Sequence, residues 1–395
     1  MNCVFPLQYN PRNIGHFQNC HYVMIYPSHE MYAAVVVPGN NSELVTQLLG
    51  ERQWRILDTD ADASWEECDL MWKQGTKKGI WKMLRVEQGL NHLLNHNVIT
   101  AKDSLIDTLS HSCPSMSKFI PPSFIISKEE QAIGIFRNAK RIMKSCGDSA
   151  LSLGENVWIV KPASDWGGSG IHVVHNIGQY RSAMRRQRHQ RLILQKYVEK
   201  PLLIEKYKFD IRLWVLMDHS GQIWMHRYPY LRRSIWPYDL QDPNLAVHLT
   251  NWVVQQKENA AIDTIIDWEQ WNYDDRAKVA IWQAMRECVQ EVFQAAQKPL
   301  LASLESFPKC FELFGFDFML DASCHVWLLE VNTNPSLSTG NSNSNSPVLQ
   351  RRVPAMLEAL FSLTIDQIFP PTTEKDAPSS QQDLFESVVH LRQGE

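Results

Sequence analysis

The stretch FELFGFDFMLDASCHVWLLEVNTNP, residues 311–335, consists of two apolar segments separated by a short polar turn. It predicts an antiparallel hairpin whose side chains alternate between two faces. If Asp321 pairs with Val326 across a four-residue turn, the register also pairs Asp317 with Glu330. One face then carries apolar side chains and belongs to a core, whereas the other carries two facing carboxylates.

The same register predicts the other partners on both faces. On the apolar face the predicted pairs are Phe316 with Val331, Phe318 with Leu329, and Leu320 with Trp327. On the second face they are Gly315 with Asn332, Asp317 with Glu330, and Met319 with Leu328. Two carboxylates about 5 Å apart repel each other unless a cation or a proton lies between them. With the amide oxygen of Asn332, they predict the oxygen-rich site that suits magnesium bound to phosphate. The alternative is a wet edge where both acids face water.

A second apolar stretch, KYKFDIRLWVLMDHSG at 206–221, also carries charged side chains at alternate positions. Strand alternation places Lys208, Asp210 and Arg212 on one face and a row of apolar side chains on the other. The three ionisable groups would therefore lie beside a core. They form either part of a binding site or a self-compensating row on a solvated strand.

The stretch VWIVKPASDWGGSGI at 157–171 predicts a strand, a turn of small residues at 164–170, and a second strand. Glycines allow backbone amides to approach phosphate oxygens closely, and Lys161 on the first strand supplies a positive charge. The spacing matches neither the Walker loop nor the dinucleotide-binding fingerprint. Because most glycine loops between strands are only hairpins, this stretch alone does not establish nucleotide binding.

Composition limits the class of protein. The chain has 395 residues, 44% of them apolar and 21% charged, which is typical of a globular protein with two or three domains. A formal net charge of −4 predicts no bulk attraction to nucleic acid, and no apolar run approaches the roughly 18 residues that span a bilayer. No secretory signal is recognisable, and eight cysteines without a CxxC pair predict reduced thiols. We expect a cytoplasmic protein that binds neither nucleic acid nor a membrane.

Helical and strand patterns divide the chain into segments. These are a small amino-terminal α/β domain at 20–100, a central domain at 101–199, a carboxy-terminal domain at 200–372 and a polar tail at 373–395. Amphipathic spacing predicts helices at 42–54 and 274–296. Strands joined by tight hairpins and mixed with helices indicate the α+β class with mainly antiparallel sheets.

Five motifs follow one another along the chain. They are Lys161 with its glycine loop, Gln195–Val198, Lys208–Arg212, His248–Asn251, and Gly315–Asp317 with Glu330–Asn332. In this order they resemble the tubulin tyrosine ligase-like enzymes of the ATP-grasp superfamily. The resemblance extends from about Tyr32 to Pro371, and the sequence around Lys102 is similar to the amino-terminal region of tubulin tyrosine ligases. It implies an ATP-grasp fold in which 200–372 carries the metal site.

The resemblance implies a role at ATP or Mg²⁺ for individual residues. At the phosphates these are Lys102 and Lys161, covered by the loop that contains Gly168 and Gly170. At adenine they are Gln195, Lys196 and Val198, with Tyr197 in the same motif; Lys208 and Asp210 lie near the ribose and phosphates, and Thr250 and Asn251 close the pocket. The implied magnesium ligands are Asp317, Glu330 and Asn332. The implied catalytic residues are Glu330, Arg212, which steadies the transferring phosphoryl group, and Arg232, which holds the acceptor or the amino-acid carboxylate.

The activity implied by the resemblance is that of an ATP-dependent carboxylate–amine ligase. ATP would convert a carboxyl group of tubulin into an acyl phosphate, which the amine of a free amino acid then attacks. The motif KFDIRLWVLMDH is similar to tyrosine-adding members, whereas EVNTNPSLST is closer to glutamate-adding and glycine-adding members. Tyrosine is the favoured amino acid, with a tubulin glutamylase or glycylase as the alternative.

Two features keep further functions open. Gly167, preceded by Asp165 and Trp166, stands where many relatives carry a lysine or arginine, so a catalytically weak tubulin-binding scaffold is one alternative. An ATP-grasp ligase that acts on a small metabolite is another. The stretch 180–191 predicts one short helix bearing Arg181, Arg185, Arg186, Arg188 and Arg191. This helix would bind the acidic carboxy-terminal tail of tubulin or simply face solvent. Such a partner would associate the protein with the microtubule cytoskeleton.

Overall fold

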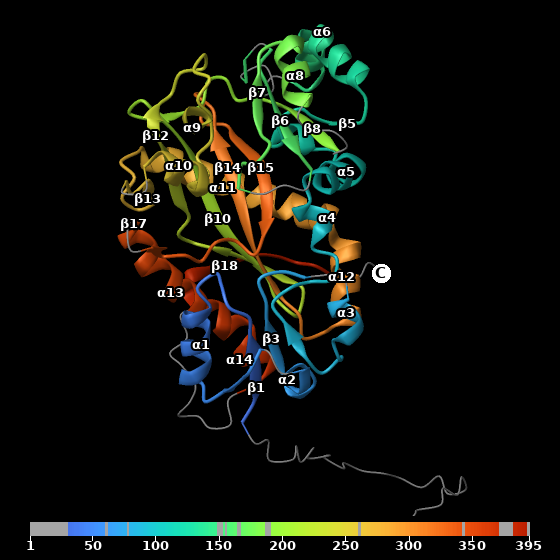
Figure 1. The fold of residues 1–395 in the computed structure, drawn as a ribbon, viewed down its shortest axis with the longest axis vertical. Helices are drawn as coiled ribbons and strands as arrows, with labels where there is room; N and C mark the ends of the chain where they lie inside the picture. Colours follow the sequence, from blue (N-terminus) through green and yellow to red (C-terminus); the bar gives the residue numbers. More distant parts are fainter. Residues whose placement is uncertain are drawn as a thin grey trace, which may run out of the picture. The chain divides into compact units, whose positions relative to one another are not determined.

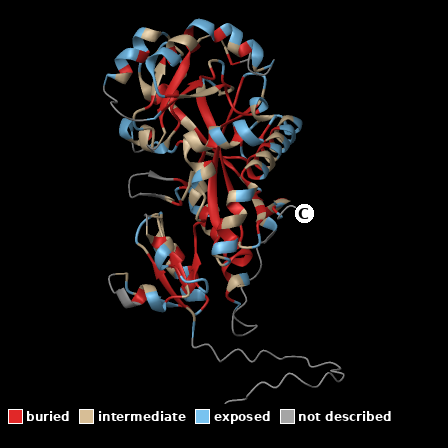
Figure 2. Cartoon of the chain, turned by 90° about the vertical axis from the view of Figure 1, so that its right-hand side faces the viewer, coloured by how far each residue is buried: buried red, intermediate tan, exposed pale blue. Residues whose placement is uncertain are grey.

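The structure is a computed structural model, and Figure 1 shows its helices and strands, which begin with the strand Ala33–Val36. The described residues are 31–59, 62–76, 79–147, 153–154, 156–163, 167–185, 191–259, 262–341, 344–370 and 382–392. They form two four-stranded sheets, one eight-stranded sheet and a small two-stranded sheet. Buried residues follow the long strands of the large sheet, whereas exposed residues lie on the outer faces of the helices (Figure 2).

The amino-terminal sheet is parallel. Its order is β2 (Arg55–Leu57), β1 (Ala33–Val36), β3 (Leu70–Trp72) and β4 (Gly89–Leu90), and its helices are α1 (Ser42–Glu51), α2 (Asp62–Glu67) and α3 (Ile80–Met83). Parallel pairing needs crossover connections, which these helices supply. The helix predicted at 42–54 is therefore confirmed in α1, although this sheet departs from the antiparallel pairing expected for most of the chain.

The second sheet is antiparallel. Its order is β5 (Ser123–Ile126), β8 (Leu192–Lys196), β6 (Trp158–Pro162) and β7 (His172–Val174). Helices α6 (Glu129–Ser145) and α8 (Ile177–Met184) bury their apolar residues against it. The arginines predicted on one helix are divided, because Arg181 lies in α8 whereas Arg191 precedes β8 and pairs with Asp103 and Asp107 of helix α5 (Lys102–Ser112). Arg186 and Arg188 lie outside the described residues, so the predicted single arginine helix is wrong for Arg191.

The large sheet contains the long strands predicted in the carboxy-terminal half. Its strands lie in the order β13 (Ile265–Asp267), β12 (Tyr230–Pro237), β10 (Tyr207–Met217), β11 (Gln222–His226) and β18 (Phe385–His390). Two further strands, β9 (Leu203–Ile204) and β14 (Glu312–Leu320), also pair with β10. The last strand, β15 (Val326–Thr333), pairs with β14. The remaining helices of eight or more residues are α5 (Lys102–Ser112), α11 (Asp275–Ala295), α12 (Gln297–Ser306) and α13 (Pro347–Leu363). The short elements are α4 (Asn97–Thr100), η1 (Met116–Lys118), α9 (Leu245–His248), α10 (Trp252–Glu258), β16 (Gly340–Asn341), β17 (Ser344–Asn345), α14 (Ile365–Ile368) and η3 (Gln382–Leu384).

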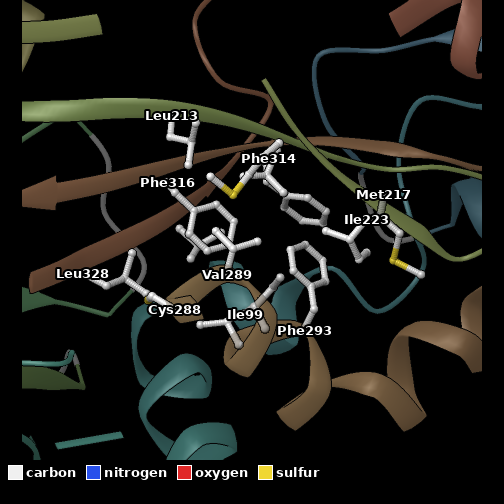
Figure 3. Packing of buried hydrophobic residues seen from close by; sticks show 14 of the residues in the cluster. Ile99, Leu213, Met217, Ile223, Cys288, Val289, Phe293, Phe314, Phe316 and Leu328 are labelled. Atoms are coloured by element: carbon white, nitrogen blue, oxygen red, sulfur yellow. The ribbon is translucent and has the colours of Figure 1, made fainter. Parts of the chain in front are cut away.

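Helix α11 supplies the core beneath the hairpin. The side chain of Asp274 accepts a hydrogen bond from the amide of Ala277 and caps the helix start. Its buried residues recur at helical spacing, so that Val289 and Phe293 face the strands (Figure 3). The rings of Phe293 and Phe314 meet edge to face, with centroids 5.5 Å apart. The predicted helix at 274–296 is thereby confirmed.

The hairpin register agrees with the prediction only at its open end. Asp317 pairs with Glu330 as expected, but the register then shifts, and Phe318 pairs with Leu328. Leu329 is the extra residue of a β-bulge on β15. The predicted pairs of Phe318 with Leu329, Met319 with Leu328, Leu320 with Trp327 and Asp321 with Val326 are therefore wrong, and Leu320 pairs with Val326 instead.

The side chain of Asp321 explains the shift. Its carboxylate accepts hydrogen bonds from the backbone amides of Ser323 and His325 and from the indole of Trp327. These bonds make Asp321 part of a five-residue turn, so it does not pair with Val326; it forms an isolated antiparallel bridge with Pro201 instead. The bulge restores the predicted pairing from Asp317 and Glu330 toward the open end of the hairpin. It also places Leu328 in the core beside Phe316 (Figure 3).

The segment predicted as a polar tail contains a strand. Residues 371–381 lie outside the described residues, but β18 pairs antiparallel with β11 and extends the large sheet. Phe385, Val388 and Leu391 are buried, whereas Ser387 and His390 are exposed. Because polar residues precede β18 in the sequence, the tail was predicted to contain no strand.

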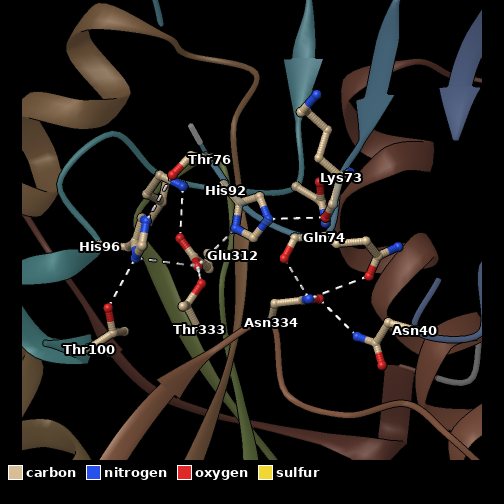
Figure 4. Close-up of polar contacts among 12 residues, drawn as sticks. Asn40, Lys73, Gln74, Thr76, His92, His96, Thr100, Glu312, Thr333 and Asn334 are labelled. Atoms are coloured by element: carbon tan, nitrogen blue, oxygen red, sulfur yellow. Dashed lines mark hydrogen bonds and ion pairs between the residues drawn. The ribbon is translucent and has the colours of Figure 1, made fainter. Parts of the chain in front are cut away.

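A buried carboxylate joins the amino-terminal region to the hairpin (Figure 4). Glu312, at the start of β14, is fully buried and accepts hydrogen bonds from the backbone amide of Leu93 and the hydroxyl of Thr333. His92 Nδ1 lies 3.1 Å from its carboxylate, and His92 Nε2 lies 3.1 Å from the carbonyl oxygen of Lys73. Burial alone would raise the pKa of Glu312, but His96 and His92 offset that effect and lower it.

Replacing Glu312 with leucine is expected to reduce the free energy of unfolding by about 3–5 kcal/mol, because it leaves buried donors without their acceptor. Urea denaturation of the full chain measures this loss. Glu287 is exposed on α11, so Glu287→Leu is a control expected to change stability by no more than about 0.5 kcal/mol. A loss below about 1 kcal/mol for Glu312→Leu would show that the network does not hold the two regions together.

Candidate functional site

One cavity gathers almost all residues predicted to bind ATP and magnesium. It is formed by strands β6 and β8 of the second sheet and by β10, β12, β14 and β15 of the large sheet. The predicted residues that line it are Lys102, Lys161, Gly168, Gln195, Lys196, Tyr197, Val198, Lys208, Asp210, Arg232, Thr250, Asn251, Asp317, Glu330 and Asn332. Arg212 lines an adjoining cavity instead, and Gly170 lies in the same loop as Gly168 without being among the lining residues.

The charged row on β10 is buried. Lys208, Asp210 and Arg212 are only 2%, 3% and 6% exposed, which excludes the solvated-strand alternative. Their apolar neighbours on the opposite face, including Phe209 and Ile211, belong to the main core. Because isolated charges are costly to bury, each of these groups must be paired.

Two arginines and two aspartates form the charged centre of the site. Nε and Nη2 of Arg212 lie 2.5 and 3.0 Å from the two oxygens of Asp317. Arg232 makes the equivalent fork to Asp210, at 2.7 and 2.6 Å, and its Nη2 also lies 2.9 Å from Asp317 Oδ2. The hydroxyl of Thr250 donates to Asp210 Oδ2 at 2.5 Å. These bidentate contacts hold both carboxylates in fixed orientations.

The electrostatics keep Asp317 ionised. Burial would raise the pKa of its carboxyl, but Arg212 and Arg232 more than offset this and hold that pKa well below its usual range. Asp317 is 2% exposed, so the wet-edge alternative does not apply to it. Glu330 lies opposite, and its Oε2 is 3.3 Å from Nζ of Lys102.

The donor set at this end of the cavity fits a magnesium ion. Asn332 Nδ2 lies 3.2 Å from Asp317 Oδ2 and 3.5 Å from Glu330 Oε1, so the three side chains converge on one point. Turning the amide by half a rotation would bring its oxygen to that point. Among the described residues no cluster of three His, Cys, Asp or Glu side chains has metal-binding geometry. An ion held here would therefore rely on two carboxylates, one amide oxygen and further oxygens from phosphate or water.

Two buried lysines also line the cavity. Lys161 Nζ donates to Gln195 Oε1 at 2.7 Å, and Lys208 Nζ donates to the hydroxyl of Tyr197 at 2.6 Å. That hydroxyl lies 2.9 Å from His248 Nδ1. Burial lowers the pKa of Lys161 to about 8 and the pKa of Lys208 to about 7.

Lys196 has a structural contact that the sequence did not reveal. Its ammonium lies 2.6 Å from Glu199 Oε1 and donates to the carbonyl oxygens of Val157 and Tyr197. Burial lowers the pKa of Lys196, and Glu199 counteracts this effect. The ammonium is thus engaged by protein groups, although the residue lines the cavity.

The glycine loop requires its glycines. Gly167, Gly168 and Gly170 have φ values of 64°, 81° and 67°, in the left-handed region that side chains disfavour. A Cβ added at Gly168 would lie 2.9 Å from Cγ2 of Val254. Asp165 and Trp166 lie outside the described residues, so their effect on nucleotide binding stays a prediction.

Sequence reasoning missed several apolar residues of the cavity. These are Ile159, Ile171, Leu249, Met319 and Leu329. Ile159 is two residues before Lys161 on β6, so strand alternation could have placed it on the same face. Leu329 could not be found in this way, because the bulge alone turns it to the cavity. None of the described helices is long and apolar enough to cross a membrane.

Comparisons with known proteins identify the family of the chain. Residues 82–376 match the model of the tubulin-tyrosine ligase family. Tubulin glycylase 3A of Drosophila melanogaster is 33% identical over 56% of this chain and 23% of its own length. Tubulin monoglutamylase TTLL4 of Homo sapiens is 29% identical over 77% of this chain and 25% of its own length, and tubulin glycylase 3C of Tetrahymena thermophila is 29% identical over 60% and 23%.

The chain spans about a quarter of the length of these curated relatives. The family model, in contrast, covers well over half of the chain. The members of that family are ATP-dependent ligases with an ATP-grasp fold, which agrees with the fold class and the family expected from the sequence. The chain belongs to the tubulin-tyrosine ligase family.

Proposed function

We propose that this chain is an ATP-dependent carboxylate–amine ligase that joins glycine or glutamate to a carboxyl group of tubulin. The observation that carries the proposal is the convergence of Asp317, Glu330 and Asn332 at one end of a cavity that also contains Lys102 and Lys161. Tyrosine was the amino acid favoured by the sequence, but the relatives reported above are glycylases and a glutamylase. The alternative expectation, a glycylase or glutamylase, is therefore the better supported one.

The proposed reaction has two steps. A carboxylate oxygen of the acceptor attacks the γ-phosphorus of ATP, and the bond to ADP breaks, giving an acyl phosphate. The amine of the free amino acid then attacks the acyl carbon, phosphate leaves, and the amine loses a proton. Both steps bring negative groups together, so catalysis depends on stabilising charge rather than on a side-chain nucleophile.

The residues of this chain suit that task. Asp317, Glu330 and Asn332 would hold magnesium, which when bound neutralises charge on phosphate oxygens. Lys102 and Lys161 would bind the phosphates, while Arg212 and Arg232, fixed by their aspartate forks, present rigid cations beside the reacting groups. Apart from Lys196, which is paired with Glu199, the cations are Lys102, Lys161, Lys208, Arg212 and Arg232, and the carboxylates they face are Asp210, Asp317 and Glu330. With both buried lysines protonated, the positive excess is about two charges, which matches the net charge of a magnesium–ATP complex.

Labelling of tubulin tests the proposal. The protein is incubated with ATP, magnesium and tubulin in the presence of each radiolabelled amino acid in turn, and the label on the tubulin band is measured. Label from glycine or glutamate is expected. Label from tyrosine alone would overturn the choice of amino acid. Turnover of ATP with free amino acids in the absence of tubulin would indicate a small-metabolite ligase, and tubulin binding without any label would indicate a scaffold.

The buried lysines predict that ATP affinity depends on pH. Phosphate favours the protonated form of Lys208 and Lys161, so binding raises pKa values that start near 7 and 8. Affinity should be full below about pH 7 and should then fall as pH rises through 8, by up to about tenfold per pH unit for each lysine. Titration calorimetry with ATP in two buffers of different ionisation enthalpy measures both the affinity and the uptake of protons. A flat affinity with no proton uptake would contradict the assignment of both lysines to the phosphates.

The proposed partners follow from the same chemistry. They are the acidic carboxy-terminal tail of tubulin and a free amino acid, with ATP and Mg²⁺ bound in the cavity. A cytoplasmic location in association with the microtubule cytoskeleton is part of this proposal.

A further inference from the structure

A second cavity, of about 770 Å³, adjoins the acidic end of the site. It shares Gly167, Arg232, Asn251, Glu330 and Asn332 with the first cavity. Many of its other side chains are amides or hydroxyls: Asn40, Gln74, Thr264, Thr333, Asn334, Ser336, Ser338 and Ser346. Uncharged groups that both donate and accept hydrogen bonds suit a peptide backbone, and the adjacent arginines suit a carboxylate.

One wall of this cavity is the chain that follows β15. Asn334, Pro335, Ser336 and Ser338 line the second cavity and are not among the lining residues of the first. This segment begins two residues after Asn332. Its conformation therefore affects the space beside the reacting groups without forming part of the nucleotide pocket.

Two loops of the amino-terminal sheet hold that wall (Figure 4). Asn40 Nδ2 donates to Asn334 Oδ1 at 2.9 Å and to the carbonyl oxygen of Pro335 at 3.1 Å, while the amide of Leu337 donates to Asn40 Oδ1 at 2.7 Å. Asn334 Nδ2 donates to the carbonyl oxygen of Gln74 at 2.7 Å. The side chain of Gln74 donates to the carbonyl oxygens of Val37 and Gly39, which closes the network onto the loop that carries Asn40.

The backbone at these positions is unusual. Asn40 and Asn334 have φ values of 44° and 43°, in the left-handed region where asparagine and glycine are the common residues. Each asparagine thus combines a strained backbone with side-chain bonds to the opposite loop. Asn40 and Gln74 also lie before residue 82, where the match to the family model begins. This part of the cavity wall is therefore held by a region of the chain outside the family match.

We propose that Asn40, Gln74 and Asn334 form an amide clamp that positions the wall of the acceptor cavity and so determines how well this chain binds its acceptor peptide. The proposal rests on the proposed function for the identity of the acceptor, a peptide with glutamate side chains. The three residues are positioning residues, because their hydrogen bonds go to the protein. Their loss should weaken acceptor binding and leave ATP binding unchanged.

The substitution Asn40→Gly tests the clamp, because glycine keeps the left-handed backbone and removes the amide. The KM for the acceptor is expected to rise about tenfold, while kcat and the KM for ATP change by less than about twofold. Gln53→Gly is the matched control: Gln53 also has a positive φ, of 61°, in the amino-terminal region, but it is not among the residues lining either cavity. An unchanged acceptor KM in Asn40→Gly, or an equal loss of ATP affinity, would overturn the proposal.

Two further measurements separate this proposal from the ligase activity. Asn334→Gly should also weaken acceptor binding, and the losses of the two single variants should be less than additive in the double variant, because both break the bond between Asn40 Nδ2 and Asn334 Oδ1. Binding of a fluorescent glutamate-rich peptide, read by anisotropy, should weaken about tenfold in each variant even if no amino acid is transferred to tubulin. Failure of the unmodified protein to bind that peptide would overturn the clamp proposal, whereas failure of labelling alone would overturn only the proposed function.

Discussion

Replacing Glu330 with glutamine is expected to reduce the transfer of an amino acid to tubulin by about a thousandfold. The substitution keeps the size of the side chain and removes one of the two negative charges that would hold magnesium. Its effect on stability should be small, because Glu330 is half-buried and its ion pair with Lys102 is partly exposed to solvent. The rate of labelling and the melting temperature of the same preparation measure the two effects separately.

Two comparisons make this result specific. Asp317→Asn should be similarly inactive but less stable by about 3–5 kcal/mol, because Arg212 and Arg232 then share a neutral partner in a buried position. Glu386→Gln is the matched control, since Glu386 pairs with Arg227 and Arg286 far from the cavity lining. That variant should retain full labelling. Labelling at the normal rate in Glu330→Gln would rule out the assignment of this carboxylate to the metal.

The hairpin illustrates which parts of the site can be predicted from sequence. The pairing of Asp317 with Glu330 follows from strand alternation and the apolar pattern, because a one-residue slip there would expose Phe316 and Val331. The closed end was predicted wrongly, because hydrophobic alternation carries no information about the turn bonds of Asp321. The bulge that follows decides that Leu329 and not Leu328 reaches the cavity.

Long-range polar contacts could not be predicted from the sequence for a different reason. The motif order predicts that Lys196 lies with the other motif residues, and it does line the same cavity, but the motif does not predict that Glu199 engages its ammonium. Likewise, nothing in the local pattern around Asn40 shows that its side chain meets Asn334, since the two residues come together only when two sheets pack. A side chain in a loop has no periodic signal that predicts its direction.

The paired forks of the site explain why arginine is needed at position 212. Lysine would keep the positive charge beside Asp317, but it cannot make two parallel hydrogen bonds to one carboxylate. Arg212→Lys should therefore lower kcat by about a hundredfold. The affinity for ATP should stay within about threefold of normal, because a rigid cation near the transferring phosphoryl group acts mainly on the transition state. The free energy of unfolding should fall by about 1–3 kcal/mol as one buried hydrogen bond to a charged group is lost.

Arg352→Lys provides the comparison that separates catalysis from stability. Arg352 makes the same kind of fork, with Nε and Nη2 at 3.2 and 3.0 Å from the oxygens of buried Asp267, but it lines neither cavity. The two lysine variants should lose similar amounts of stability, and only Arg212→Lys should lose kcat. Equal losses of kcat would mean that Arg212 acts by holding the fold, whereas a selective loss requires that its guanidinium face the reacting phosphoryl group.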